Sequence, residues 1–188
     1  MNPQWDVSDL DNEGQEDDEQ PKSFLEYDEN RNIVGLVHDR ELNDFDEDNG
    51  VWLPKNPIIS ENYALGINEN AFNGCNRLTK IICQNVTTIG ASAFANCSQL
   101  QSIKFPSVST VSNDAFNLCV KLENVELPNV TFLNYGAFSH CYRLEKIYLP
   151  SLVTLKRDVF NACVTLSQVD FPNAETTDIG TFAGCYGL

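Results

Sequence analysis

A histidine stands directly before a cysteine at His140 and Cys141, in a chain of 188 residues that carries seven cysteines and two histidines. An imidazole beside a thiol could act as the base that activates a nucleophile. Cysteine and histidine are also side chains that zinc prefers. The pair therefore raises two chemical hypotheses, a catalytic dyad and a metal site, which the surrounding sequence can test.

Cys141 belongs to a motif, Ala-Phe-x-x-Cys-x-x-Leu with Val or Thr for Ala in the last two copies, that recurs with a constant period of 22 residues. The repeated cysteines are Cys75, Cys97, Cys119, Cys141, Cys163 and Cys185, and the phenylalanines are Phe72, Phe94, Phe116, Phe138, Phe160 and Phe182. The column of His140 holds Gly74, Asn96, Leu118, Ala162 and Gly184 in the other copies. The histidine is therefore not part of the pattern, and the repeat does not support a dyad.

The repeated cysteines are interpreted as core packing residues, because cysteine is small, weakly polar and often buried. Two alternatives stay open: zinc binding, which requires converging thiols, and disulfides, which require suitable geometry and an oxidising compartment. Cys83 occupies a strand position held elsewhere by Phe or Leu and is expected in the core as well. His38 lies among charged residues and is expected to be solvated.

Composition and motifs exclude several classes of function. No catalytic constellation or phosphate-binding glycine loop is found in the sequence, so we expect no enzymatic activity, no cofactor, no metal site and no small-molecule substrate. The net charge is −15, but seventeen of the 27 acidic residues lie in residues 1–50, and no basic stripe favours nucleic acid. No apolar run is long enough for a membrane span, and the N-terminus does not resemble a signal peptide. The sequence thus predicts a cytoplasmic or intracellular protein, with the cell surface as the alternative.

Each repeat contains the signals of one coil of a solenoid. Apolar residues alternate after each motif, as at Ile81 and Cys83 or Ile103 and Phe105, which predicts a short strand. A proline then ends most of these strands. The residue before each Ala-Phe pair is a good helix N-cap, which predicts a short helical turn there; these residues are Asn70, Ser92, Asp114, Gly136, Asp158 and Gly180. We expect an α/β solenoid of about six coils, with a parallel sheet on one face and helical turns on the other.

The combined pattern L-x-x-I-x-L-P-x-V-x-x-I-x-x-x-A-F-x-x-C-x-x-L resembles the BspA-like class of leucine-rich repeat over residues 57–188. The resemblance implies a stacked repeat array and, among known roles, a cell-surface adhesin. The sequence differs from commoner leucine-rich repeats in one respect. Their asparagine after the strand aligns with Val108, Val130 and Leu152, so no asparagine ladder is expected at that column.

The outward residues of the predicted strands form two columns, which we name the strand face. One column is Ile82, Lys104, Glu126, Tyr148 and Asp170, and the other is Lys80, Ser102, Asn124, Lys146 and Gln168. An aromatic anchor amid mixed charges suits a protein partner. We therefore predict partner binding at Ile82, Lys104, Glu126, Tyr148, Asp170, Lys80 and Lys146, while a plain solvated sheet surface is the alternative.

The N-terminal third differs from the repeats. Residues 1–22 hold eight carboxylates and one lysine and are expected to be a disordered acidic arm. Residues 23–56 are expected to form a hairpin and an N-terminal cap, with a turn at 28–32, an acidic linker at 43–50 and Trp52 covering the first coil.

The last repeat ends at Leu188, where a further strand would begin, and would leave apolar side chains uncovered. These observations favour a non-enzymatic module that binds a protein through the strand face, through its C-terminal coil, or both. Self-association through that coil is one form of this hypothesis. The alternatives are a cell-surface adhesin of the BspA-like type and a structural subunit of a larger assembly.

Overall fold

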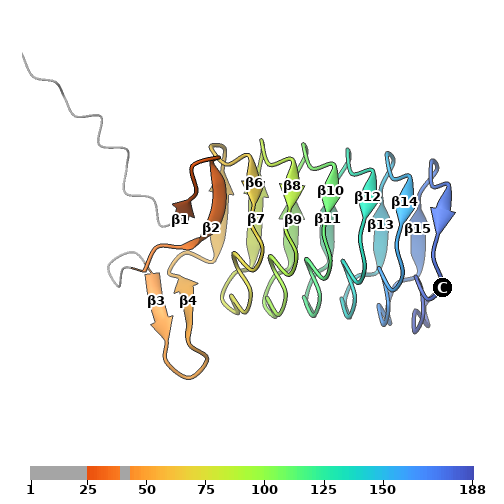
Figure 1. The fold of residues 1–188 in the computed structure, drawn as a ribbon. Coiled ribbons are helices and arrows are strands. Elements are labelled where there is room, and N and C mark those ends of the chain that lie inside the picture. Colours follow the sequence, from red (N-terminus) through yellow and green to blue (C-terminus); the bar gives the residue numbers. More distant parts are fainter. Residues whose placement is uncertain (1–24, 39–42) are drawn as a thin grey trace, which may run out of the picture.

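The computed structural model of the chain describes residues 25–38 and 43–188 and shows a solenoid of stacked 22-residue coils (Figure 1). The acidic arm predicted for residues 1–22 lies outside the described residues. The strands of the described part are β1 (Leu25–Tyr27), β2 (Asn32–Leu36), β3 (Asn43–Asp46), β4 (Val51–Pro54), β5 (Ile58–Glu61), β6 (Gly66–Ile67), β7 (Lys80–Cys83), β8 (Thr88–Ile89), β9 (Ser102–Lys104), β10 (Thr110–Val111), β11 (Asn124–Glu126), β12 (Phe132–Leu133), β13 (Lys146–Tyr148), β14 (Thr154–Leu155), β15 (Gln168–Asp170) and β16 (Thr176–Thr177).

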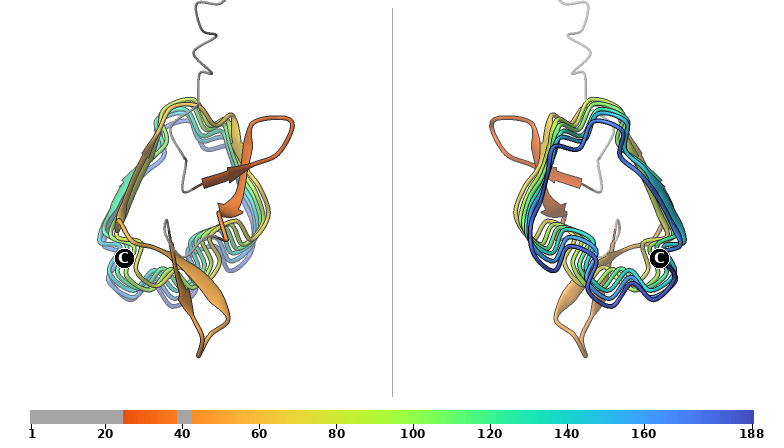
Figure 2. Two further views of the ribbon diagram at one scale, coloured as in Figure 1. Left: turned by 90° about the vertical axis from the view of Figure 1, so that its left-hand side faces the viewer. Right: turned by 90° about the vertical axis from the view of Figure 1, so that its right-hand side faces the viewer.

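Two sets of parallel strands run along the stack. An eight-stranded sheet has the order β1-β2-β6-β8-β10-β12-β14-β16, and only its β1–β2 pair is antiparallel. The second set forms a four-stranded sheet, β11-β9-β7-β5, and a separate pair, β13-β15. Viewed along the stack, successive coils lie nearly over one another around a common interior (Figure 2). The repeat therefore supplies two strand-bearing sides, of which the sequence predicted one.

The predicted strands are confirmed at the positions where apolar and polar residues alternate. Ile81 pairs with Ile59 on one side and Ile103 on the other. All three side chains are fully buried. The strand at Ile59, which no copy of the motif precedes, thus stacks in register with the strands of the repeats that follow. The strands of the other sheet are two residues long in each repeat, as at β8 and β10, and are too short to produce a periodic signal.

The repeated phenylalanines form a continuous ladder through the interior. Neighbouring rings from Phe72 to Phe182 are stacked with centroids 5.1 to 5.7 Å apart and interplanar angles of 2 to 14°. Phe72 through Phe160 are fully buried, whereas Phe182 in the final coil is only partly buried. Each ring from Phe94 to Phe160 therefore packs against the coils on both sides of it, which is how a repeat without a core of its own becomes stable.

The helical turns predicted before each Ala-Phe pair are wrong: the described residues contain no helix there but tight turns. The residues taken as N-caps have left-handed backbone, with φ from 52° to 79°. Their main-chain bonds also run between coils, as when Asn70 N–H donates to the carbonyl oxygen of Ala91 at 3.0 Å. Asn, Asp, Ser and Gly serve both as N-caps and as residues that tolerate the left-handed region. The same residue types therefore produced a misleading helix signal.

The N-terminal cap consists of two hairpins. The predicted first hairpin is confirmed by the antiparallel pairing of β1 with β2. At its turn the Asp28 carboxylate accepts hydrogen bonds from the Asn32 main chain at 2.8 Å and from the side chains of Asn32 and Asn68 at 3.0 Å, with the Asn32 main-chain bond first among the causes that hold the pKa of Asp28 below its ordinary value. β2 then joins the repeat sheet beside β6.

The acidic segment 43–50, expected to be a linker, is instead half of a second hairpin. β3 pairs antiparallel with β4, and Phe45 lies opposite Trp52 with ring centroids 5.3 Å apart. Trp52 also stacks on His38 at 5.2 Å and packs against the core, as expected of a cap residue. The hairpin extends beyond the outline of the coils (Figure 2). His38 is thus a ring-stacking residue rather than only a solvated one.

A polar ladder runs along one corner of the stack, one position before the column where the sequence excluded an asparagine ladder. Each side chain donates to a main-chain carbonyl of the preceding coil. The bonds are Asn85 to Asn62 at 2.5 Å, Ser107 to Gln84 at 2.8 Å, Asn129 to Pro106 at 2.7 Å and Asn173 to Pro150 at 2.6 Å. In this repeat the polar side chains that bridge neighbouring coils therefore stand at an exposed position, next to the position that asparagine usually holds.

Candidate functional site

The cysteine column is buried and bonded to the main chain. Cys97, Cys119, Cys141 and Cys163 are fully buried, and all seven cysteines are free thiols. Each thiol from Cys97 to Cys185 donates to a carbonyl oxygen of the preceding coil; for Cys97 this is Phe72, at 3.0 Å, and for Cys119 it is Phe94, at 3.2 Å. Cys75 donates instead to the Trp52 oxygen of the cap hairpin, at 3.6 Å. Burial raises the pKa of Cys75 from its ordinary value of 9.0 to about 12. These thiols are therefore weak nucleophiles that serve the fold.

His140 and Cys141 point to different surroundings. The Cys141 thiol reaches the Phe116 carbonyl oxygen at 3.4 Å, inside the stack. The His140 ring instead lies 2.8 Å from the hydroxyl of Ser139 through Nδ1 and packs edge-on against Tyr142. The adjacent pair in the sequence is not a dyad in the structure. Among the described residues, no three His, Cys, Asp or Glu side chains gather where they could hold a metal ion.

The strand face exists as a surface of aligned columns, but it is not continuous. Ile82 lies beside Lys104, Lys104 beside Glu126, and Tyr148 beside Asp170. In the second column Lys80 lies beside Ser102 and Lys146 beside Gln168. No pairing joins β11 to β13 in the part of the chain that the structure describes, so Glu126 and Tyr148 are not strand neighbours. The predicted binding residues fall into two groups.

The break between β11 and β13 is visible in the main-chain bonds. We call the contact between two neighbouring coils a step. In the step before the break, Glu123 N–H donates to the Gln101 oxygen at 3.0 Å, and in the step after it, Ser167 N–H donates to the Glu145 oxygen at 2.9 Å. The corresponding bond from Glu145 N–H to the Glu123 oxygen is absent from the described residues.

The main-chain bonds at the C-terminal ends of these strands show the same difference. Phe105 N–H donates to the Glu126 carbonyl oxygen at 3.0 Å, and Leu149 N–H donates to the Asp170 carbonyl oxygen at 3.1 Å. The equivalent bond from Leu127 N–H to the Tyr148 oxygen is likewise missing within the described chain. Two donors and two acceptors are therefore left without a main-chain partner on the facing edges of the two strands.

The same step is closed at the other sheet and in the core. β12 pairs with β14, and the Phe116 and Phe138 rings are stacked at 5.1 Å. The coils thus separate on the side of the strand face. We name the gap between β11 (Asn124–Glu126) and β13 (Lys146–Tyr148) the slot.

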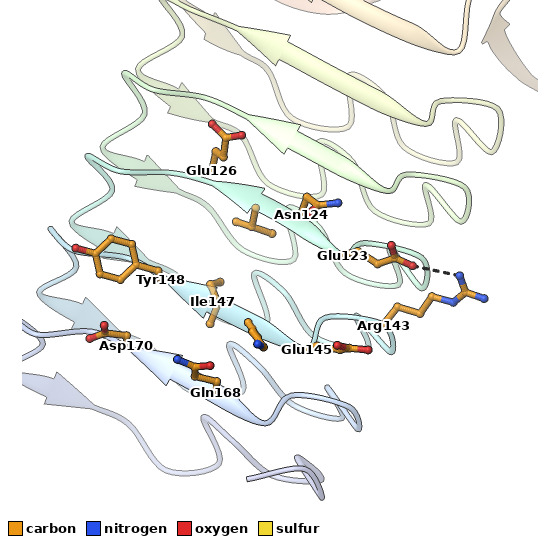
Figure 3. A pocket seen from close by; sticks show the side chains of 11 residues that line it. Glu123, Asn124, Glu126, Arg143, Glu145, Ile147, Tyr148, Gln168 and Asp170 are labelled. Carbon is orange, nitrogen blue, oxygen red and sulfur yellow. Dashed lines mark hydrogen bonds and ion pairs between the residues drawn. The ribbon is translucent and has the colours of Figure 1, made fainter.

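The slot opens into a groove of about 760 Å³. Figure 3 shows its lining, with Tyr148 and Asp170 at one end and the Glu123–Arg143 ion pair, 3.2 Å long, at the other. The full lining is Glu123, Asn124, Val125, Glu126, Arg143, Glu145, Lys146, Ile147, Tyr148, Gln168 and Asp170. Four carboxylates face two basic groups, and Tyr148 is 58% exposed. The groove is a polar, net acidic site with an aromatic side chain beside it.

Sequence reasoning missed the slot, although one signal was present. Glu123 and Glu145 occupy the same column in successive coils, where the neighbouring coils have Gln101 and Ser167. Like charges at neighbouring positions repel each other across a sheet. Glu123 instead pairs with Arg143, while Glu126 is held by Lys104 at 2.8 Å on the closed side.

The final coil has exposed apolar side chains. Ile179 is 89% exposed and Tyr186 is 87% exposed, and the outer edges of β15 and β16 have no neighbouring strand among the described residues. In the described part of the chain, no helix has the length and apolar character needed to cross a bilayer.

Comparison with known families identifies the repeats. Residues 66–188 match the family described as BspA type leucine rich repeat region, in six copies. The chain belongs to this family. The match covers the BspA-type coils that carry both the phenylalanine ladder and the slot. No curated protein matches the chain.

Solved structures of leucine-rich repeat proteins share the fold. A leucine-rich repeat protein from Bacteroides ovatus is 28% identical over 69% of this chain and 36% of its own, with a TM-score of 0.64. A leucine rich cell surface protein from Faecalibacterium prausnitzii is 19% identical over 78% of this chain and 51% of its own, with a TM-score of 0.61. The T. pallidum leucine-rich repeat protein is 20% identical over 89% of each chain, with a TM-score of 0.57. The chain therefore spans about a third to a half of the first two proteins.

Proposed function

We propose that this BspA-type array is a non-enzymatic protein-binding module whose contact surface is the strand face. The observation that carries the proposal is the arrangement of exposed side chains there: Tyr148 is 58% exposed beside mixed charges, on strands held rigid by the stack. An exposed aromatic on a rigid scaffold can bind with little loss of conformational entropy. The buried, bonded thiols and the separation of His140 from Cys141 support a role without covalent chemistry.

The test is site-specific photocrosslinking in the cell that makes the protein. A photoreactive amino acid is placed in turn at Ile82, at Tyr148 and at Tyr135, which is 46% exposed and follows β12 of the other sheet. The expected result is one shared partner captured from Ile82 and Tyr148 and not from Tyr135. Equal capture from all three positions, or capture from Tyr135 alone, contradicts the proposal.

A cell-surface adhesin is the second candidate, supported by the similarity to a protein described as a leucine rich cell surface protein. The alternative is the cytoplasmic location expected from the sequence. Fractionation with protease treatment of intact cells distinguishes these two forms of the module. Digestion of the repeats in intact cells supports the adhesin, and full protection supports an internal location.

A contact through the final coil is a further candidate, either as self-association or as a subunit of a larger assembly. Its support is the exposure of Ile179 and Tyr186 beside the open edges of β15 and β16. An Ile179→Lys/Tyr186→Lys variant is expected to lower the mass measured by light scattering if copies stack through this coil. A wild-type mass equal to one chain contradicts self-association.

A further inference from the structure

Tyr148 is an exposed aromatic side chain without a partner. It is 58% exposed and lies beside the slot. Its side chain makes no hydrogen bond and no contact with another ring or a cation in the part of the chain that the structure describes. Its strand, β13, is paired with β15 and not with β11. The tyrosine ring is therefore free to contact a ligand, on a strand that the stack holds in place.

Other aromatic rings at the surface already carry a cation. The guanidinium carbon of Arg31 lies 4.1 Å from the centroid of the Tyr63 ring, and Arg31 Nη2 donates to the Tyr63 carbonyl oxygen at 2.5 Å. The ammonium nitrogen of Lys156 lies 5.9 Å from the centroid of the Phe132 ring. The face of an aromatic ring carries negative potential, which attracts a cation. Tyr148 offers the same kind of surface without a cation of its own.

Carboxylates stand on both sides of Tyr148 in its column of the strand face. On one side Glu126 is held by Lys104 at 2.8 Å. On the other side Asp170 is the strand neighbour of Tyr148 and has no ion pair within the described chain. Neighbouring strands lie about 4.8 Å apart, so one cationic group reaches both the ring and the Asp170 carboxylate.

The unpaired charge of the groove is net negative. Glu123 and Arg143 of the lining pair with each other. Glu145 and Asp170 form no ion pair among the described residues, and Lys146 is the basic group of the lining that remains to oppose them. Two negative charges against one positive charge favour a ligand that brings a single positive charge.

The width of the slot shows which part of a partner fits. A strand placed between β11 and β13 would require them to lie about 9.5 Å apart, twice the ordinary strand spacing. The Cα atoms of the two strands instead come within 8 Å of each other. A side chain that lies on the outer surface of the groove needs no such separation. The ligand group is therefore a side chain and not a main-chain segment.

The chemistry of the site distinguishes between the two basic side chains. A guanidinium group is planar, stacks on an aromatic face and can donate two parallel hydrogen bonds to one carboxylate. An ammonium group is a compact and strongly hydrated charge that cannot bind in this two-pronged way. A ring beside an unpaired carboxylate, as at Tyr148 and Asp170, therefore suits arginine better than lysine.

We propose that the strand face binds a partner protein through an arginine side chain, which stacks on Tyr148 and pairs with Asp170. The proposal rests on the proposed function and specifies the group of the partner that is recognised. The guanidinium plane lies on the tyrosine ring, and its N–H groups donate to the carboxylate oxygens of Asp170. Glu145 contributes a second negative charge in the same groove.

The first experiment titrates the full chain with three blocked amino acids and follows the NMR resonances of Tyr148 and Asp170. The probes are N-acetylarginine methylamide, the lysine compound, and the citrulline compound, which has the shape of arginine without its charge. The arginine compound is expected to bind with a dissociation constant on the order of 1 mM. The lysine compound is expected to bind at least about threefold more weakly, and the citrulline compound at least about tenfold.

Two results of the titration overturn the proposal. One is the absence of saturable binding by the arginine compound. The other is equal binding of the citrulline compound, because the site then does not recognise the charge. Equal binding of the lysine compound overturns the assignment to a guanidinium group.

Variants locate the site. Tyr148→Ala and Asp170→Asn are each expected to weaken binding of the arginine compound at least about fivefold, whereas Tyr148→Phe keeps the ring and is expected to bind within about twofold of the wild type. The matched controls are Tyr135→Ala and Glu175→Gln, which change exposed side chains outside the groove lining and are expected to leave binding unchanged. Equal weakening by the controls overturns the assignment to this site. Thermal unfolding verifies that each variant is folded.

The partner captured by photocrosslinking at Ile82 separates this inference from the proposed function. In a pull-down with the purified chain, that partner is expected to be lost with Asp170→Asn and retained with Glu175→Gln. Retention of the partner by Asp170→Asn overturns the inference and leaves the proposed function intact. Failure to capture a partner at either Ile82 or Tyr148 contradicts the proposed function, while the NMR titration still decides whether Tyr148 and Asp170 bind arginine.

Discussion

Each repeated thiol is both a packing residue and a hydrogen-bond donor. The Sγ of Cys119 is fully buried and donates to Phe94, and the same bond recurs from Cys185 to Phe160 at 3.0 Å. The carbonyl that accepts it belongs to the coil before, so the thiol joins two coils. The hydrogen bond explains the repeated cysteine better than side-chain volume does, because alanine and valine have no side-chain hydrogen-bond donor.

The thiols predict how stability depends on alkaline pH. Burial raises the pKa of Cys75 to about 12 and the pKa of Cys185, chiefly by burial, to about 11, both from 9.0. A thiol whose pKa is higher in the folded state loses its proton first in the unfolded chain. Its contribution to stability is therefore complete below pH 9 and is lost as the pH rises toward 12.

Denaturant unfolding at a series of pH values above 9 measures this loss. A Cys75→Ala variant, with one fewer of these thiols, is expected to be less stable at pH 7 but to lose less stability as the pH rises. An identical pH dependence for the variant and the wild type contradicts the assignment to Cys75.

Left-handed backbone predicts a second residue-scale effect. Ala162 has φ 58° at a position where Gly74 has φ 75°. Left-handed backbone costs a residue with a Cβ about 1 to 2 kcal/mol, whereas glycine adopts it freely. Ala162→Gly is therefore expected to raise the free energy of unfolding by about 0.5 to 1 kcal/mol.

Gly74→Ala is the reciprocal control. The added Cβ would meet nothing closer than Val51 Cγ1 at 3.6 Å, so its effect reports the backbone alone. The expected result of denaturant unfolding is a loss of stability of about 0.5 to 1 kcal/mol, the reverse of the gain in Ala162→Gly. A neutral Gly74→Ala together with a destabilising Ala162→Gly contradicts the account.

Among the elements, the slot has a measurable dynamic signature. The amides of Leu127 and Glu145 lack the bonds that Phe105, Leu149 and Ser167 make at equivalent positions. We expect Leu127 and Glu145 to exchange hydrogen faster than those three, because an amide without a hydrogen-bond partner is less protected. The difference should be confined to the slot, since β12 pairs with β14 and the Phe116 and Phe138 rings are stacked between the same two coils. Hydrogen exchange with single-residue resolution measures this directly.

A charge-removing variant tests the cause of the break. If repulsion between Glu123 and Glu145 holds the coils apart, Glu145→Gln is expected to slow exchange at both amides. Glu175→Gln removes an exposed carboxylate outside the slot and serves as the control. Unchanged exchange in Glu145→Gln shows that like charge does not open the slot.

The elements also show which features the sequence could predict. The strands at Ile81 and Ile103 were predictable because burial and exposure alternate there. The turns at Asn70 and Asp158 were mistaken for helix starts because the same side chains suit both conformations. The slot could not be predicted from the repeat, because a repeating pattern predicts the same bonds at every step. Only the pair Glu123 and Glu145 marked this step as different.

For the whole molecule, the phenylalanine ladder predicts how stability is distributed. Phe116 is stacked between Phe94 and Phe138, both at 5.1 Å, and is fully buried. Phe116→Ala is expected to cost about 3 to 5 kcal/mol, because the cavity weakens the contacts with two neighbouring coils. Phe182→Ala, in a partly buried ring with a Phe neighbour in one adjacent coil, is expected to cost less than half as much.

Denaturant unfolding of the two variants provides the comparison. Equal losses contradict a stack in which stability resides in the interfaces between coils. The same experiment shows whether the open step on the strand face divides the array. Phe116 lies at that step, and a second unfolding transition in Phe116→Ala alone would assign the coils on either side to separate units.

Most side-chain hydrogen bonds between coils run in one direction, with Ser139, which donates to the Asn161 oxygen of the next coil at 3.3 Å, as an exception. Asn129 donates to Pro106, Thr131 to Ser109 and Cys141 to Phe116, so the acceptor in each case comes earlier in the chain. A ribosome releases the polypeptide in that same order. A newly emerged coil therefore finds its acceptors on coils that have already folded, and the array can assemble one turn at a time during translation.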